Sequence, residues 1–144
     1  MMGVEKSASV VWNGTELDFH AELGSGYEFD MRGPATTDGG SPVEFMLAGV
    51  AGCTAMDVVH ILRKRRLAVT DITVEIKGVQ AEEAPNVFTD ATIIYVIRGD
   101  GISPAAVEKA IQLSQDKYCS ASIMFQRAGV NISTAYRIEE PVAA

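Results

Sequence analysis

One stretch constrains the fold of this 144-residue chain more than any other, and it reads SPVEFMLAGVAGCTAMDVVHILRKRR over residues 41–66. Ser41 followed by Pro42 and then Glu44 is typical of a helix start, with Ser41 as the N-cap and Glu44 closing a capping box. Residues 45–56 are nearly all apolar or small. A helix with an apolar surface on every side belongs in a core, so we expect this one to be covered on most sides.

The small residues of this helix predict close packing. Gly49 and Gly52 each cost about 1 kcal/mol against alanine inside a helix, so we expect another helix or a sheet to approach there. Cys53 lies in the middle of this small-residue surface. The apolar run has about a dozen residues before Asp57, fewer than the roughly 20 that span a bilayer, so no membrane segment is expected.

Composition and charge exclude several classes of protein. A formal net charge of −7 argues against a nucleic-acid partner. The basic cluster at residues 63–66 is instead typical of the end of a helix, where positive charge is favourable. The N-terminus carries no signal-peptide pattern, so a cytoplasmic protein is expected, with one domain over residues 1–144. Two cysteines in a reducing compartment indicate free thiols or a redox pair.

The N-terminal part predicts three antiparallel strands. Residues 7–12 and 15–23 flank Asn13-Gly14, a strong signal for a hairpin with a two-residue turn. Residues 27–31 alternate apolar and charged side chains, as a half-exposed third strand does. Residues 33–40 form a flexible loop that is rich in Gly, Thr and Pro, and this loop leads into the helix that begins at residue 41.

The C-terminal part adds strands and two further helices. Residues 71–80 and 87–98 predict a pair of strands, the second buried on both faces at its centre. Ser103-Pro104 begins an amphipathic helix, whose pattern breaks around residues 117–120 before a short third helix. Residues 130–138 predict the last strand. The fold class is therefore α+β, in the order β-β-β-α-β-β-α-α-β.

The two cysteines are the strongest candidates for chemistry. A buried Cys53 taken alone is most often a small apolar residue. Cys119 falls at a helix start, where the helix dipole lowers the pKa of a thiol, so the pair indicates a redox role. Asp57 and His60 fit a surface pair better than a catalytic base. Metal binding by the cysteines with His20 and His60 lacks any ligand spacing, and no metal site is expected.

Two segments, SPVEFMLAGVAGCTAMDVV on the first helix and KYCSAS before the last strand, together resemble the OsmC/Ohr family of osmotically induced and organic hydroperoxide resistance proteins, over residues 7–138. The resemblance implies an intertwined homodimer in which antiparallel sheets wrap around two long central helices, with two sites at the interface. It also implies that Cys53 reduces an organic hydroperoxide and that Cys119 resolves the product.

The chain departs from the peroxidase pattern of that family at two positions. In the family a Glu directly follows the Pro of the helix start, whereas here Val43 follows and Glu44 comes one residue later. The family also supplies an Arg from the first hairpin, and the turn here has none. Glu44 is therefore either the capping residue or a site residue, and Arg32 is the substitute cation. The pattern is closest to the OsmC-like branch.

The sequence thus predicts a cytoplasmic, homodimeric peroxidase with Cys53, Cys119, Glu44 and Arg32 in its site. An organic hydroperoxide is the expected substrate and an external dithiol the expected reductant, with no cofactor, metal, nucleic acid or membrane involved. The alternative is a non-catalytic protein in which an apolar interface pocket binds a lipid-like or aromatic molecule and the thiols take no part.

Overall fold

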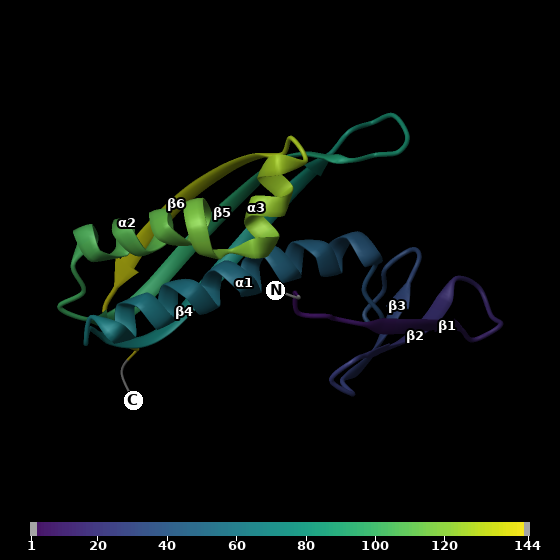
Figure 1. Ribbon diagram of the computed structural model, residues 1–144, viewed down its shortest axis with the longest axis horizontal. Helices are drawn as coiled ribbons and strands as arrows, with labels where there is room; N and C mark the ends of the chain where they lie inside the picture. The colour runs from purple at the N-terminus through teal and green to yellow at the C-terminus, as the bar shows by residue number, and fades with distance from the viewer. Residues whose placement is uncertain (1–2, 143–144) are drawn as a thin grey trace. The chain divides into compact units, whose positions relative to one another are not determined.

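The computed structural model describes residues 3–142 and confirms an α+β fold with the predicted order of elements (Figure 1). One π-helical turn, η1, is added between the second and third helices. The elements are β1 (Ala8–Trp12), β2 (Asp18–Leu23), β3 (Glu28–Arg32), α1 (Pro42–Lys64), β4 (Ala68–Gln80), β5 (Phe88–Asp100), α2 (Pro104–Leu113), η1 (Ser114–Tyr118), α3 (Ser120–Arg127) and β6 (Asn131–Glu139). The chain divides into two compact units, Met1–Met46 and Leu47–Ala144, and each is described by itself.

The first unit contains an antiparallel sheet in the order β1-β2-β3, as the sequence predicts. The hairpin loop is longer than the predicted two residues, because the backbone N–H of Asn13 pairs with Asp18 O at 3.0 Å. The Asn13 side chain instead accepts a hydrogen bond from Thr15 N at 2.9 Å, and Gly14 and Glu16 both adopt positive φ. Because of this local turn, the second strand begins at Asp18 and not at Thr15.

The start of α1 is the predicted capping box. The backbone N–H of Ser41 donates to Glu44 Oε1 at 2.9 Å, and Glu44 N–H donates to Ser41 Oγ at 3.4 Å. Each residue therefore satisfies a backbone donor of the other, and the helix begins at Pro42. Within the same unit, the ring of Phe45 packs on Phe29 of β3, with centroids 4.6 Å apart.

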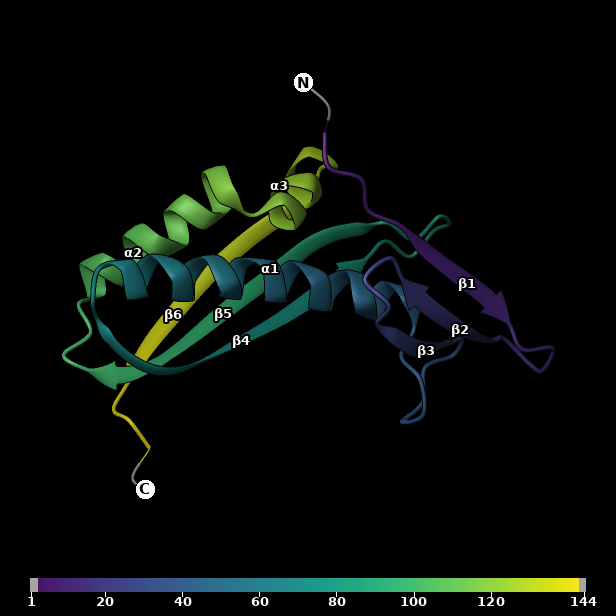
Figure 2. The same ribbon diagram turned by 60° about the horizontal axis from the view of Figure 1, so that its bottom comes forward.

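The second unit contains a sheet in the order β4-β5-β6. β4 and β5 form the predicted antiparallel pair, whereas β5 and β6 are parallel, which differs from the antiparallel sheets that the family resemblance implied. Parallel neighbours need a long crossover, and the segment from α2 to α3 provides it. The helices α1 and α2 lie on one face of this sheet (Figures 1 and 2).

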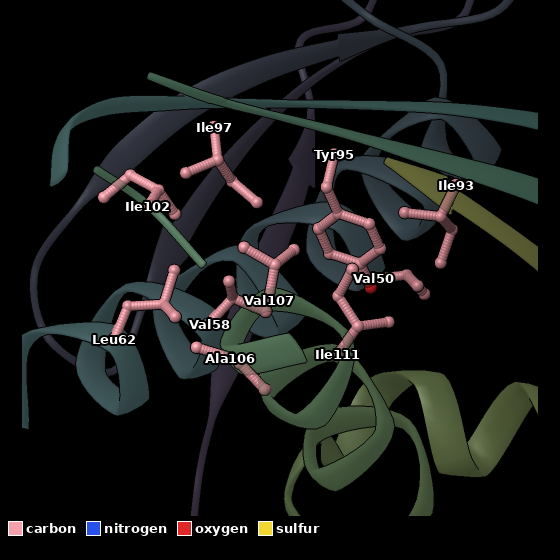
Figure 3. Packing of buried hydrophobic residues seen from close by; sticks show 11 residues of the cluster. Val50, Val58, Leu62, Ile93, Tyr95, Ile97, Ile102, Ala106, Val107 and Ile111 are labelled. Carbon is pink, nitrogen blue, oxygen red and sulfur yellow. The ribbon is translucent and has the colours of Figure 1, made fainter. Parts of the chain in front are cut away.

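The core of the second unit lies between this sheet and the two helices (Figure 3). Tyr95, Val96 and Ile97 are consecutive residues of β5 and are at most 1% exposed, which confirms that the centre of this strand is buried on both faces. The cluster consists of Val50, Val58, Leu62, Ile93, Tyr95, Ile97, Ile102, Ala106, Val107, Ala110 and Ile111.

Only one stripe of α1 is buried within the chain, and its members are Val50, Thr54, Val58 and Leu62. The expectation that the helix is covered on most sides is therefore wrong for a single chain, since Met56 is 75% exposed. A Cβ atom added at Gly49 or Gly52 would meet nothing within 4 Å. The close approach predicted at these glycines is not made by the described residues of this chain.

α1 is also long and apolar enough, by length and composition alone, to cross a membrane. The sequence expectation to the contrary counted the apolar run only as far as Asp57, whereas the helix continues to Lys64. Core helices of globular proteins pass the same test, and α1 directs Thr54 and Asp57 into hydrogen bonds with its own unit. The absence of a membrane partner remains a prediction.

Candidate active site around two cysteines

Cys53 lies at the middle of α1 and is half-buried. Its Sγ is 3.9 Å from the hydroxyl oxygen of Ser120, the first residue of α3. Helical geometry turns the next side chain, Thr54, to the buried stripe and leaves Cys53 at its edge. The thiol is therefore placed beside the start of α3 while part of it remains accessible to a small molecule.

Cys119 occupies the junction between η1 and α3, where the sequence predicts a break. Its backbone N–H donates to Ser114 O at 2.8 Å and closes the π turn, and its extended backbone makes it the N-cap of α3. The sulfur then accepts a hydrogen bond from Ser122 N at 3.3 Å, in the place of the usual Ser or Asp oxygen. The side chain of Cys119 is fully buried.

The electrostatic surroundings of Cys119 correct the expectation of an acidic thiol. Burial raises the pKa of Cys119 from 9.0 to about 12, while the N–H of Ser122 lowers this pKa by a smaller amount. The neighbouring Cys53 raises it further through a hydrogen bond and its charge, so the two free thiols lie near each other. The loss of hydration outweighs the donor at the helix start, and Cys119 is a protonated thiol near neutral pH.

A network of buried polar side chains lies beside the two thiols. Thr54 Oγ1 is 2.7 Å from Tyr95 Oη and 2.7 Å from Ser114 Oγ. Gln115 Nε2 donates to Tyr95 Oη at 3.0 Å, and Gln115 Oε1 accepts from Ser122 Oγ at 2.6 Å. Because each member is bonded to another, the network joins α1, β5, η1 and α3 at the place where both cysteines lie.

The network ends at Asp57, whose Oδ2 accepts a hydrogen bond from Ser114 Oγ at 2.9 Å. Within residues 3–142 no hydrogen bond or ion pair joins Asp57 to His60, so the expected surface pair does not form. Sequence reasoning missed this network. In the sequence, only Thr54 indicates the network, because it is a polar residue on an otherwise apolar helix face. Tyr95 and Ser114 occupy positions that fit the apolar pattern, so the sequence does not predict their hydrogen bonds to Thr54.

The other two predicted site residues belong to the first unit. Glu44 takes the capping role, as shown above. Arg32 Nε lies 3.4 Å from Asp18 Oδ1 with no hydrogen-bond partner among the described residues, and its side chain packs where a Cβ on Gly39 would lie. An approach of Glu44 or Arg32 to Cys53 remains a prediction.

His20 on β2 lies between two carboxylates of β3. His20 Nε2 lies 2.8 Å from Glu28 Oε1 and His20 Nδ1 lies 2.8 Å from Asp30 Oδ1. The hydrogen bond to Glu28, followed by that to Asp30, raises the pKa of His20. Over residues 3–142 no group of three or more His, Cys, Asp or Glu side chains is arranged to hold a metal ion.

A partly exposed thiol beside a buried one, on an α+β fold with this order of elements, defines a protein with two neighbouring free thiols. The chain belongs to the OsmC-like protein family, because the family model described as "OsmC-like protein" matches residues 35–135. The match includes both cysteines and crosses the boundary between the two units.

Known proteins similar to this chain agree with that assignment. Protein YhfA of Escherichia coli (strain K12) is 38% identical over 122 residues, which are 85% of this chain and 90% of that protein. A hypothetical protein from Aquifex aeolicus VF5 is 30% identical, with a TM-score of 0.84 over 98% of this chain and all of that chain. An organic hydroperoxide resistance protein from Elizabethkingia anophelis shares the fold, at 18% identity and a TM-score of 0.70 over 96% of this chain and 99% of its own.

Proposed function

We propose that this protein reduces organic hydroperoxides with Cys53 and resolves the oxidised sulfur with Cys119. The observation that carries the proposal is the pairing of a half-buried thiol with a fully buried, protonated one. Cys53 is partly exposed and Cys119 is buried, which supports Cys53 as the thiol that meets the peroxide. The organic hydroperoxide resistance protein that shares this fold favours the same class of substrate.

The proposed reaction runs in three balanced steps. The Cys53 thiolate attacks the terminal peroxide oxygen, the O–O bond breaks, and the alkoxide leaves and takes a proton to become an alcohol. The thiol of Cys119 then attacks the sulfenic acid of Cys53, which forms a disulfide and releases water. An external dithiol reduces the disulfide, is itself oxidised, and returns both thiols.

The pKa of Cys119 supports this order of events. The charge of Cys53 is one of the causes that raise the pKa of Cys119. Oxidation of Cys53 to a neutral sulfenic acid removes that charge, so Cys119 becomes more acidic only after the first step. Burial, the largest cause of the raised pKa, is unchanged by this step, so oxidation of Cys53 lowers the pKa of Cys119 only in part.

Arg32 and Glu44 complete the proposed site. A cation near Cys53 would favour its thiolate, and Arg32 is the proposed cation, although its Nε lies 3.4 Å from Asp18 Oδ1. Glu44 would orient that guanidinium while keeping its capping role, because a carboxylate has two oxygens and the cap uses only Oε1.

We also propose that the whole chain is one OsmC-like domain that works as a cytoplasmic homodimer. The exposed apolar side of α1, with Met56 and the two open glycines, favours a second subunit as its cover. The family match across both units favours a single domain. A net charge of −7 makes a nucleic-acid partner unfavourable.

Peroxide consumption tests the proposal. With an organic hydroperoxide and a dithiol present, Cys53→Ser should abolish turnover. Reduced Cys119→Ser without any dithiol should consume about one equivalent of peroxide and stop at the sulfenic acid of Cys53. Arg32→Ala should slow Cys53 oxidation by about 10-fold if it shifts the thiol pKa by about one unit. Consumption by Cys53→Ser at the rate of the parent protein would leave the non-catalytic binding protein as the function.

A further inference from the structure

A cavity of about 650 Å³ lies in the second unit, formed by α1, α2 and η1. Neither cysteine lines it. The side chains around it come from the last two turns of α1 and the residues just after it, from α2 and from the end of η1, and they are Asp57, His60, Ile61, Lys64, Arg65, Lys109, Leu113 and Tyr118. The proposed peroxidase chemistry makes no use of this cavity.

Three cations line the cavity. Lys64 and Arg65 come from the end of α1 and Lys109 from α2. None of the three takes part in an ion pair within the part of the chain that the structure describes. Arg65 and Lys109 also line an adjoining cavity of about 310 Å³, so both side chains border open space on two sides.

The helix dipole explains only part of this cluster. Positive charge at the C-terminal end of α1 is favourable, which accounts for Lys64. Lys109 is the sixth residue of α2 and gains nothing from that effect, yet it faces the same cavity. All three side chains are exposed, and three unpaired cations that line one cavity give it a positive potential, which favours an anionic ligand there.

The rest of the cavity sets the shape of that ligand. Ile61, Leu113 and the ring of Tyr118 provide an apolar wall. Asp57 lies seven residues before Lys64 on the same helix, which separates the two positions by about 10 Å along the helix axis at 1.5 Å per residue. A second negative charge on the ligand would therefore be repelled at the far end of the cavity.

We propose that this cavity binds a small amphipathic molecule with a single anionic head. The carboxylate or phosphate head pairs with Lys64, Arg65 and Lys109, and the apolar body packs on Ile61 and Leu113. Neither cysteine lines the cavity, so its occupancy does not require either thiol.

Titration calorimetry on the reduced full chain tests the proposal with four probes of similar length: octanoate, octyl phosphate, octanol and the dicarboxylate suberate. Octanoate or octyl phosphate should bind one molecule per chain, and the comparison of the two identifies the preferred head. Octanol and suberate should each bind at least about 10-fold more weakly, because one lacks the charge and the other meets Asp57. A higher salt concentration should weaken the binding of octanoate and leave the binding of octanol unchanged.

Matched variants separate the site from general charge effects. The double variant Lys64→Gln/Lys109→Gln should lose at least about 10-fold in affinity for the anions, whereas Lys6→Gln/Lys77→Gln, with the same change of charge on exposed positions, should not. If the first double variant does not fold, Arg65→Gln replaces it in the same comparison. Cys53→Ser should bind octanoate with the affinity of the parent protein. Equal affinities for octanoate and octanol, equal losses in both double variants, or no binding of either anion would each overturn the proposal.

Discussion

Two opposite influences act on the sulfur of Cys119. The N–H of Ser122 at the start of α3 stabilises the thiolate, and burial destabilises it. Burial is the larger effect, because complete removal from water costs a charged sulfur more than one backbone donor returns. The residue is therefore an N-cap that stays protonated, ready to act only when its surroundings change.

This balance predicts how stability depends on pH. The folded pKa of about 12 lies above the ordinary value of 9.0, so the stabilisation from Cys119 is complete below about pH 9 and is lost as the pH rises towards 12. Urea unfolding should show that the free energy of unfolding falls more for the reduced parent protein than for Cys119→Ser between about pH 8 and about pH 10.5. Lysines and tyrosines titrate equally in both proteins, so an equal fall of the free energy of unfolding in the two would contradict the raised pKa of Cys119.

The sequence was sufficient to predict which elements hold the two cysteines, but not to predict the direction of the pKa shift of Cys119. The motif around Cys53 and the break before Cys119 fix their elements, since caps and breaks are local signals. Burial depends on the packing of α1, which is distant in the sequence, beside the start of α3, and burial reversed the predicted direction of the Cys119 pKa.

At the scale of the element, α1 combines a strong local start with a weakly covered surface. The capping box of Ser41 and Glu44 determines where the helix begins. Its buried stripe accounts for only one face, and the exposed face holds Met56 and the open glycines. The local signals were readable from the sequence, whereas the cover of the other face was not, because it depends on what packs against it.

The capping box gives a prediction that separates the two roles of Glu44. Ser41→Ala and Glu44→Ala should each lower the free energy of unfolding by about 1 kcal/mol, and Glu44→Gln should retain most of it, since Gln also serves in a capping box. Chemical denaturation measures these values. If Glu44 also acts in the site, Glu44→Ala slows oxidation of Cys53 while Ser41→Ala does not. Unchanged stability in both alanine variants would contradict the cap.

Three other features differ from the sequence prediction, because they depend on contacts between distant residues or on backbone hydrogen bonds. The hairpin loop around Asn13 is longer because its side chain makes a local turn. β6 pairs in parallel with β5 because the crossover through α2 and α3 returns the chain in the same direction. The π turn η1 follows from the bond between Cys119 N and Ser114 O, which no sequence periodicity announces.

For the whole molecule, the apolar helix and the family match make a homodimer the expected form. An obligate interface that covers the exposed side of α1 should bury well over about 2,000 Å² in total. Sedimentation velocity at micromolar concentration should therefore give the mass of two chains, and dilution should not yield a stable folded monomer. A folded monomer under these conditions would mean that the exposed face of α1 needs another explanation.

The central claim is that Cys53 and Cys119 form one redox pair, and peptide mapping after a single oxidation tests it most directly. Disulfide geometry requires the two Cα atoms to come within about 7 Å. Reduced protein treated with one equivalent of an organic hydroperoxide should yield the Cys53–Cys119 crosslinked peptide, formed within one chain, together with one equivalent of alcohol. Recovery of two free thiols with the hydroperoxide unconsumed, or of crosslinks between chains only, would contradict the account.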